Sequence, residues 1–128
     1  MQYNSVLFDP PCPAVDVSVE VPIATGRSVR ILAQVDTGAD FCVIPQRVIW
    51  ELALVPYRTN RFIEHDSPVV KVKDVYRVRV AIGQLQPFMV DCVHYPFVDA
   101  DDYMVLGREG LNQLRTLLEG PQQQLSFL

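Results

Sequence analysis

The sequence lacks the features that mark membrane and secreted proteins. No apolar run approaches the ~18 residues that a membrane-spanning helix needs. Residues 1–5 have neither the basic cluster nor the apolar stretch of a signal peptide. The length, 128 residues, fits one domain. We therefore expect a cytoplasmic protein or a domain of a longer precursor, with no membrane partner.

Cysteine is also scarce. The chain has three, Cys12, Cys42 and Cys92, an odd count without regular spacing. Such a set predicts free thiols that pack as small apolar side chains, and not a disulfide framework. Cys92 and His94 stand two positions apart, but a structural zinc site needs a second pair of ligands at a matching spacing. We expect neither a metal nor another cofactor.

An excess of positive charge is missing as well. The chain has 11 Lys and Arg residues against 15 Asp and Glu residues, which gives a formal net charge of −4. Nucleic-acid-binding domains usually present a basic surface. We therefore expect no nucleic-acid partner, whereas this charge places no limit on a peptide substrate.

Most of the chain has the two-residue periodicity of β-strands. Alternating apolar residues predict strands over 14–21 and 28–35, which the short turn at 25–27 joins into a hairpin. The pattern is again β from 60 to 93, with a turn at 65–68. Other strands are expected over 41–44, 69–82, 88–93, 104–107 and 125–128.

Two short helices are expected between the strands. Pro45 suits the start of a helix over 46–54, in which we expect Trp50 to lie in the core. Four leucines at helical spacing predict a second helix, which the Gly-Pro pair at 120–121 ends. These leucines are Leu111, Leu114, Leu117 and Leu118.

The predicted fold class is therefore mostly β, with the strands forming a closed barrel or a sandwich and with short helices. The domain is expected over 14–128. Residues 1–13 are expected to be an irregular N-terminal segment, because the prolines at 10, 11 and 13 disfavour regular strand pairing.

One triplet indicates chemistry. Asp36-Thr37-Gly38 lies between the apolar stretches 31–35 and 41–44, so backbone on both sides would hold the carboxylate. Gly38 permits the close approach of another backbone. A plain turn between two strands would explain a lone triplet of this kind, so the surrounding sequence decides between the two interpretations.

The surrounding sequence resembles a known family. Residues 34–40, QVDTGAD, are similar to the active-site segment of retropepsins, the aspartic proteases of retroviral type. Residues 104–108, MVLGR, resemble the second signature of that family, in which apolar residues precede Gly-Arg. Residues 119–121 and 125–127 resemble the turn and last strand of its cellular and bacterial members. The order and spacing of these segments agree over about 14–128.

The resemblance implies a retropepsin-like closed β-barrel that acts as a two-fold homodimer. It also implies an aspartic endopeptidase that hydrolyses a peptide or protein substrate. Peptide hydrolysis needs a base that activates water and an acid that polarises the carbonyl, and two carboxylates that share one proton supply both. The chain has a single Asp-Thr-Gly triplet, so a second copy would supply the second Asp36 carboxylate.

The resemblance assigns roles within the active-site loop. Asp36 would be the catalytic carboxylate. Thr37 would bond to its twin across the two-fold axis, and both Thr37 and Gly38 are counted with the catalytic group. Gly38 would also offer its carbonyl to the substrate backbone. Ala39 and Asp40 would contact the substrate.

Other predicted roles lie outside this loop. Arg108 would pair with Asp40 and, together with Gly107, would support the loop. Residues 122–128 would lie near the subunit interface. The hairpin at 64–69 would form a flap over the peptide, with substrate contacts from Glu64, His65, Asp66 and Ser67.

Two features depart from the family pattern. The flap tip contains no glycine, and Glu109-Gly110 stands where relatives often carry Asn or Asp and then a bulky apolar residue. The unusual flap favours an alternative function, a non-catalytic retropepsin-like dimerisation or peptide-binding module. The intact segment at 36–40 and Arg108 favour the enzyme, because a scaffold would not require a carboxylate at a crowded two-fold axis.

Overall fold

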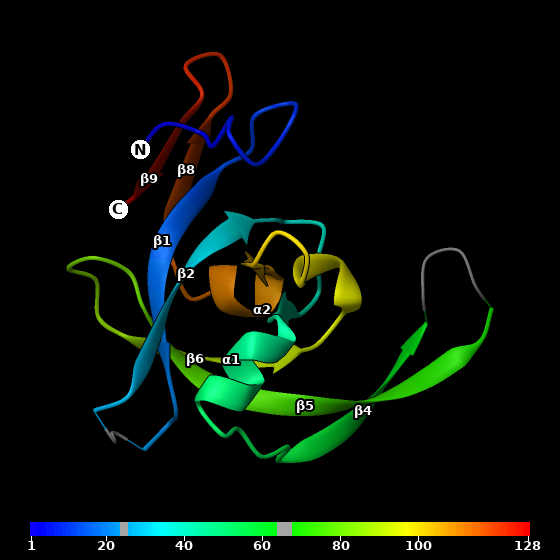
Figure 1. Cartoon of the computed structure of the whole chain (residues 1–128). Helices are drawn as coiled ribbons and strands as arrows, with labels where there is room; N and C mark the ends of the chain where they lie inside the picture. The colour runs from blue at the N-terminus through cyan, green and yellow to red at the C-terminus, as the bar shows by residue number, and fades with distance from the viewer. Residues whose placement is uncertain (24–25, 64–67) are drawn as a thin grey trace.

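The computed structural model describes residues 1–23, 26–63 and 68–128. Within these ranges the chain is mostly β, as expected, and six strands close into a mixed barrel (Figure 1). The strands follow one another around it as β1 (Ala14–Glu20), β2 (Ser28–Val35), β7 (Tyr103–Leu106), β3 (Cys42–Val43), β6 (Phe88–Val93) and β5 (Val70–Ala81).

The ring closes where β5 returns to β1, with Val19 opposite Val80. The pairs β2–β7 and β3–β6 are parallel, and the other pairs are antiparallel. The predicted hairpin of β1 and β2 is confirmed, with Ala14 opposite Gln34 at one end and Glu20 opposite Ser28 at the other.

Strand periodicity explains how the barrel buries an apolar core. On β1, Val15, Val17 and Val19 are buried whereas Asp16 is exposed. Burying one aliphatic side chain of this kind stabilises the fold by about 1.5–3 kcal/mol. They belong to the same core cluster as the fully buried Ile44, Met104, Leu106 and Leu125.

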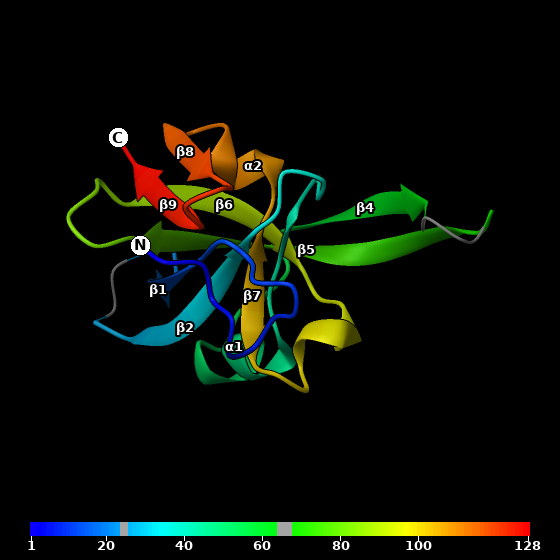
Figure 2. The ribbon, with the colours of Figure 1, turned by 90° about the horizontal axis from the view of Figure 1, so that it is seen from above.

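The strand β4 (Arg58–Ile63) lies outside the barrel ring. It pairs with the first half of β5, from Arg58 opposite Val75 to Ile63 opposite Val70. The two strands extend from the barrel as an arm (Figures 1 and 2), and much of the arm is exposed, including Val72 at 64%. The four expected flap contacts, Glu64, His65, Asp66 and Ser67, lie outside the described residues.

The helix α1 (Gln46–Glu51) is shorter than the predicted 46–54, because Ala53 has a positive φ of 49° and breaks the helical path. The expectation that Trp50 lies in the core is wrong, since Trp50 is 73% exposed. Six residues give the helix a single inward face, and Val48 and Ile49 occupy it.

The second predicted helix is wrong beyond its start. α2 covers only Arg108–Leu111, and the chain then forms the antiparallel pair β8 (Thr116–Glu119) and β9 (Gln124–Phe127). Leu117 and Leu118 therefore lie on a strand, 42% and 40% exposed. Strand pairing with β9 outweighs the helix propensity of the leucines, because tertiary contacts routinely override intrinsic propensity. The predicted final strand is confirmed.

The N-terminal segment contacts this last hairpin. Gln2 forms a bridge with Gln124, and the Tyr3 N–H donates to the carbonyl of Gln123 at 2.8 Å. Figure 2 shows the N-terminus close to β9. No helix in the ranges that the structure describes has both the length and the apolar character required to cross a bilayer.

Candidate active site

The active-site loop starts where β2 ends, and its own backbone orients the Asp36 carboxylate. The Gly38 N–H donates to Asp36 Oδ1 at 2.8 Å, and the Asp36 N–H donates to the carbonyl of Leu106 at 3.0 Å. A Cβ atom on residue 38 would lie 3.2 Å from Asp36 Oδ1 and would crowd it. Thr37 and Gly38 are exposed at the tip of the loop.

The parallel pairing of β2 with β7 brings Gly107 beside this loop. A Cβ atom on Gly107 would overlap the carbonyl of Phe41 and lie 2.8 Å from the carbonyl oxygen of Ala39, so only glycine fits. This close approach lets the Arg108 N–H donate to the Ala39 carbonyl at 2.8 Å, and the Glu109 N–H donate to the Asp40 carbonyl at 3.1 Å.

Side chains add a second link between the two segments. The guanidinium of Arg108 contacts the carboxylate of Asp40 through Nη2 and Oδ1. In the single chain the pair is open to solvent, with 55% of the Arg108 side chain and 71% of the Asp40 side chain exposed. The structure thus brings residues 36–40, Gly107 and Arg108 together.

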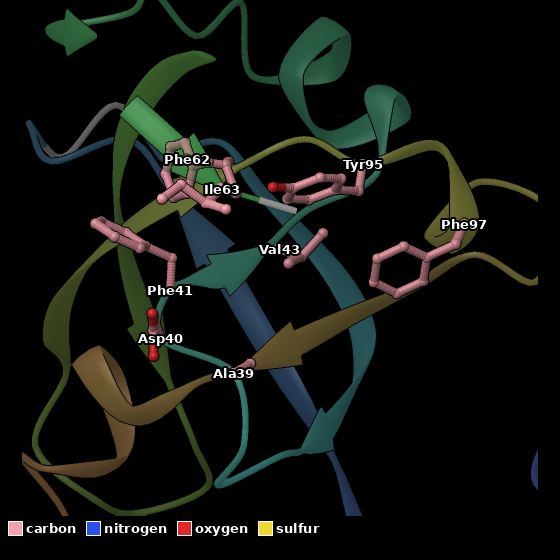
Figure 3. Close-up of a pocket in the computed structure, with 9 residues that line it drawn as sticks. Ala39, Asp40, Phe41, Val43, Phe62, Ile63, Tyr95 and Phe97 are labelled. Carbon is pink, nitrogen blue, oxygen red and sulfur yellow. The ribbon is translucent and has the colours of Figure 1, made fainter. Parts of the chain in front are cut away.

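A pocket of about 250 Å³ opens beside the loop (Figure 3). Figure 3 shows Phe41 and Phe62 on one side, Tyr95 and Phe97 on the other, and Val43 between them. The side chains come from the loop and β3, from β4, from the end of β6, and from the 3-10 helix η1 (Pro96–Val98). The full lining is Ala39, Asp40, Phe41, Val43, Phe62, Ile63, Val93, Tyr95 and Phe97.

A polar cluster that no sequence pattern predicted includes Glu109 of α2 and the β6 residue Asp91. Asp91 is buried, and its carboxylate accepts hydrogen bonds from the Tyr57 hydroxyl (2.6 Å), Arg58 (3.1 Å) and Arg77 (3.0 Å). Its backbone N–H donates to Glu109 Oε2 at 2.9 Å. A charged residue within the apolar run of β6 was the available signal, since a buried carboxylate needs partners.

Burial and hydrogen bonding have opposite effects on the pKa of each of the two carboxylates in this cluster, Asp91 and Glu109. Burial raises the pKa of Asp91, but hydrogen bonds from Tyr57, Arg77 and Arg58 outweigh it and bring the pKa below its ordinary value. For Glu109 burial dominates, and despite the hydrogen bond from the Asp91 N–H its pKa is raised.

The unusual Glu109-Gly110 pair has a packing explanation. A Cβ atom on Gly110 would lie 3.1 Å from Val90 Cγ1 and 3.2 Å from the sulfur of Cys42, so a bulky residue would not fit. Glu109, beside it, reaches the backbone of β6. The space is taken by Val90 and Cys42, and Cys42 lies opposite Cys92 in the β3–β6 pair.

The cysteines are free, as predicted, with Cys42 and Cys92 buried. Burial raises the pKa of the Cys92 thiol well above its ordinary value, so this thiol stays protonated. Outside the undescribed positions 24–25 and 64–67, His, Cys, Asp and Glu side chains form no group of three or more that could hold a metal ion.

No family model matches the sequence, and no curated protein matches it either. Solved structures match the fold. A retropepsin-like aspartic protease from Rickettsia conorii matches with a TM-score of 0.61 at 15% identity, covering 93% of this chain and 82% of that chain.

Viral proteases match as well. The simian foamy virus protease gives a TM-score of 0.55 at 17% identity, over 78% of this chain and 92% of its own. The EIAV protease, complexed with the inhibitor HBY-793, gives 0.51 at 17% identity, over 88% and 93%. With its closed mixed barrel and short helices, this chain has the fold of the retropepsin-like aspartic proteases.

Proposed function

We propose that this protein is an aspartic endopeptidase that works as a homodimer, with Asp36 of each copy as a catalytic carboxylate. The observation that carries the proposal is the fixed Asp36 side chain. Gly38 orients the carboxylate, the backbone bonds of Arg108 and Glu109 brace the loop, and a side-chain-sized pocket opens next to it.

The proposed chemistry uses the two carboxylates as one acid–base pair. The ionised carboxylate takes a proton from water while the water oxygen attacks the carbonyl carbon, and the protonated carboxyl donates to the carbonyl oxygen. The tetrahedral intermediate collapses with loss of the C–N bond, and a proton passes to the leaving amine. The peptide and one water thus become an acid and an amine.

The second copy is part of the proposal because the chain carries one such triplet. The exposed tip formed by Thr37 and Gly38 suits a contact about a two-fold axis, where the same surface meets itself. Such a contact would bring the two Asp36 side chains together and cover both tips.

Asp36→Asn tests the catalytic role. Asparagine keeps an oxygen that can accept the Gly38 N–H but removes the base, so cleavage of a peptide library should fall by at least about 10²–10⁴-fold. The matched control is Asp101→Asn, because Asp101 is exposed and outside the site. Circular dichroism should show that both variants fold. Cleavage of the same bonds by pure Asp36→Asn at the wild-type rate would refute the assignment.

Dilution tests the dimer. Because each site needs two chains, specific activity should fall once the protein is diluted below the dissociation constant of the dimer. Sedimentation over the same concentrations should show the dimer dissociating in parallel. A monomer that keeps full activity would place the second carboxylate within one chain and contradict the proposal.

A further inference from the structure

The pocket beside the active-site loop has a chemical character that goes beyond the presence of a protease site. We propose that it selects an aromatic side chain of the substrate, close to the bond that is cut, and that Phe41 and Phe62 determine this specificity. This inference rests on the proposed function and deepens it.

The position of the pocket limits which substrate residue can fill it. Ala39 and Asp40 line the pocket and follow Asp36 by three and four residues. An extended chain spans at most about 3.6 Å per residue, so the pocket lies within ~14 Å of the catalytic carboxylate. An extended substrate covers that distance in about four residues, so the side chain belongs to one of the residues near the bond that is cut.

The size of the pocket suits one side chain. Its volume of about 250 Å³ is below the ~300–1,000 Å³ that is usual for pockets that enclose a whole small molecule. Of the described residues that line it, only Asp40 is charged, and this carboxylate already contacts Arg108. An acidic substrate side chain would lose water here without gaining a partner, and would be rejected.

The arrangement of the rings favours an aromatic guest over an aliphatic one. Phe41 and Phe62 meet edge to face, with centroids 5.2 Å apart, and Tyr95 and Phe97 lie 6.1 Å apart on the facing side. Figure 3 shows Val43 and Ile63 between these two pairs. A planar ring placed there can contact both pairs in the offset or edge-to-face geometries that aromatic rings prefer.

The Phe41–Phe62 wall is held in place before any substrate arrives. Phe41 follows Asp40 directly, and Phe62 lies on β4, so the wall joins the loop to the arm. The guanidinium of Arg58 lies over the Phe41 ring, 5.8 Å from its centroid, and is itself bonded to Asp91. A preorganised wall loses less free energy on binding than a mobile one.

The test is a set of peptides that differ only at the residues flanking the cleaved bond, carrying Phe, Tyr, Leu, Ala or Lys. Wild-type protein should cleave the Phe and Tyr peptides with a kcat/KM about 10-fold above that of the Leu peptide at one position, since each ring contact contributes about 2- to 10-fold. Phe41→Leu and Phe62→Leu should each bring the ratio of the Phe-peptide kcat/KM to the Leu-peptide kcat/KM close to 1. The control Phe8→Leu removes an edge-to-face contact with Tyr103 and should keep the preference.

Binding of the same peptides to Asp36→Asn, measured by fluorescence anisotropy, separates the two proposals. Preferential binding of the Phe and Tyr peptides without any cleavage by wild-type protein would support the pocket and overturn the endopeptidase. Cleavage and binding that rank Leu equal to Phe at every position would overturn the pocket and leave the endopeptidase standing. Unchanged selectivity in both leucine variants would overturn the roles of Phe41 and Phe62.

Discussion

Two neighbouring residues of α2 contribute to two polar groups of opposite character. Arg108 pairs with Asp40, and both side chains are more than half exposed in the single chain. Glu109, next in sequence, accepts the backbone N–H of Asp91, whose side chain is only 10% exposed and receives three hydrogen bonds. One group faces the candidate active site, and the other lies against the barrel wall.

Because the two groups differ in solvent exposure, we expect one to contribute to function and the other to stability. A surface ion pair contributes about 0–1 kcal/mol to folding, so the Asp40–Arg108 pair cannot anchor the barrel. The hydrogen bonds to a buried charge contribute about 1.5–3 kcal/mol. We therefore expect the Asp91 cluster to hold the base of the arm to the barrel, and the Asp40–Arg108 pair to shape the loop.

The largest effect on stability is expected from Asp91→Asn. The variant loses the charge that accepts from Tyr57, Arg58 and Arg77, and the free energy of unfolding should fall by about 1.5–3 kcal/mol at neutral pH. Both arginines are partly exposed and can return to water, which keeps the loss below that of a fully buried pair. Urea unfolding measures the effect, with the exposed Asp74→Asn on β5 as the matched control.

We also expect the effect of Asp91→Asn on stability to depend on pH. The pKa of Asp91 is lowered in the folded chain, so its contribution is complete above the ordinary value of 3.8 and is lost as the pH falls through the folded pKa. The stabilities of wild type and Asp91→Asn should converge below pH 3.8. A gap that stays constant in acid would show that the ionised carboxylate is not what the cluster binds.

A smaller effect on stability, but a large one on activity, is expected from Arg108→Ala. The free energy of unfolding should fall by no more than about 1 kcal/mol, because the pair is exposed. The backbone bond from residue 108 to Ala39 remains, yet the Asp40 side chain loses its restraint beside the substrate. A displacement of about 1 Å can cost up to ~10²-fold in rate. We therefore expect a large fall in kcat/KM and only a small change in the free energy of unfolding.

The double variant Asp40→Ala/Arg108→Ala sharpens this contrast. If the two side chains act as one unit, the double variant should lose little more activity than either single variant loses. Strictly additive losses would show that the residues act independently. Unfolding that becomes easier by 3 kcal/mol or more would mean that the pair is buried in the working protein, as a dimer interface would make it.

Local sequence patterns predicted the parts of the fold that depend on neighbours in the chain. The alternation of Val15, Val17 and Val19 with polar residues requires one wet and one dry face, so β1 and its hairpin with β2 follow directly. The helix predicted through Leu117 and Leu118 is wrong, because pairing with β9 depends on residues further along the chain.

The candidate site likewise has a part that a local sequence segment predicts and a part that it does not. Residues 36–40 are contiguous, so a resemblance could name them from sequence alone. The pocket and the Asp91 cluster draw on segments that are far apart in sequence, and Phe62, Tyr95 and Tyr57 carry no local signal of a shared site. Their positions follow from the closure of the barrel, which no short window of sequence contains.

The smallest effect is expected from Glu109→Gln, and its size should depend on pH. Glutamine keeps an oxygen that can accept the Asp91 N–H but cannot ionise. Burial raises the pKa of Glu109 in the folded chain, so folding favours the protonated form. Wild type should therefore lose stability as the pH rises from the ordinary value of 4.5 through the raised folded pKa, and Glu109→Gln should not. The variant should gain on wild type over this window, by less than the loss caused by Asp91→Asn. Urea unfolding from pH 4 to pH 7 measures the difference.

Because the Asp91 charge contributes to the raised pKa of Glu109, the gain should shrink when the two proteins are compared in an Asp91→Asn background. A difference between Glu109→Gln and wild type that is independent of pH would show that Glu109 is solvated like a surface carboxylate, and that α2 contacts β6 without the cost of burying its charge.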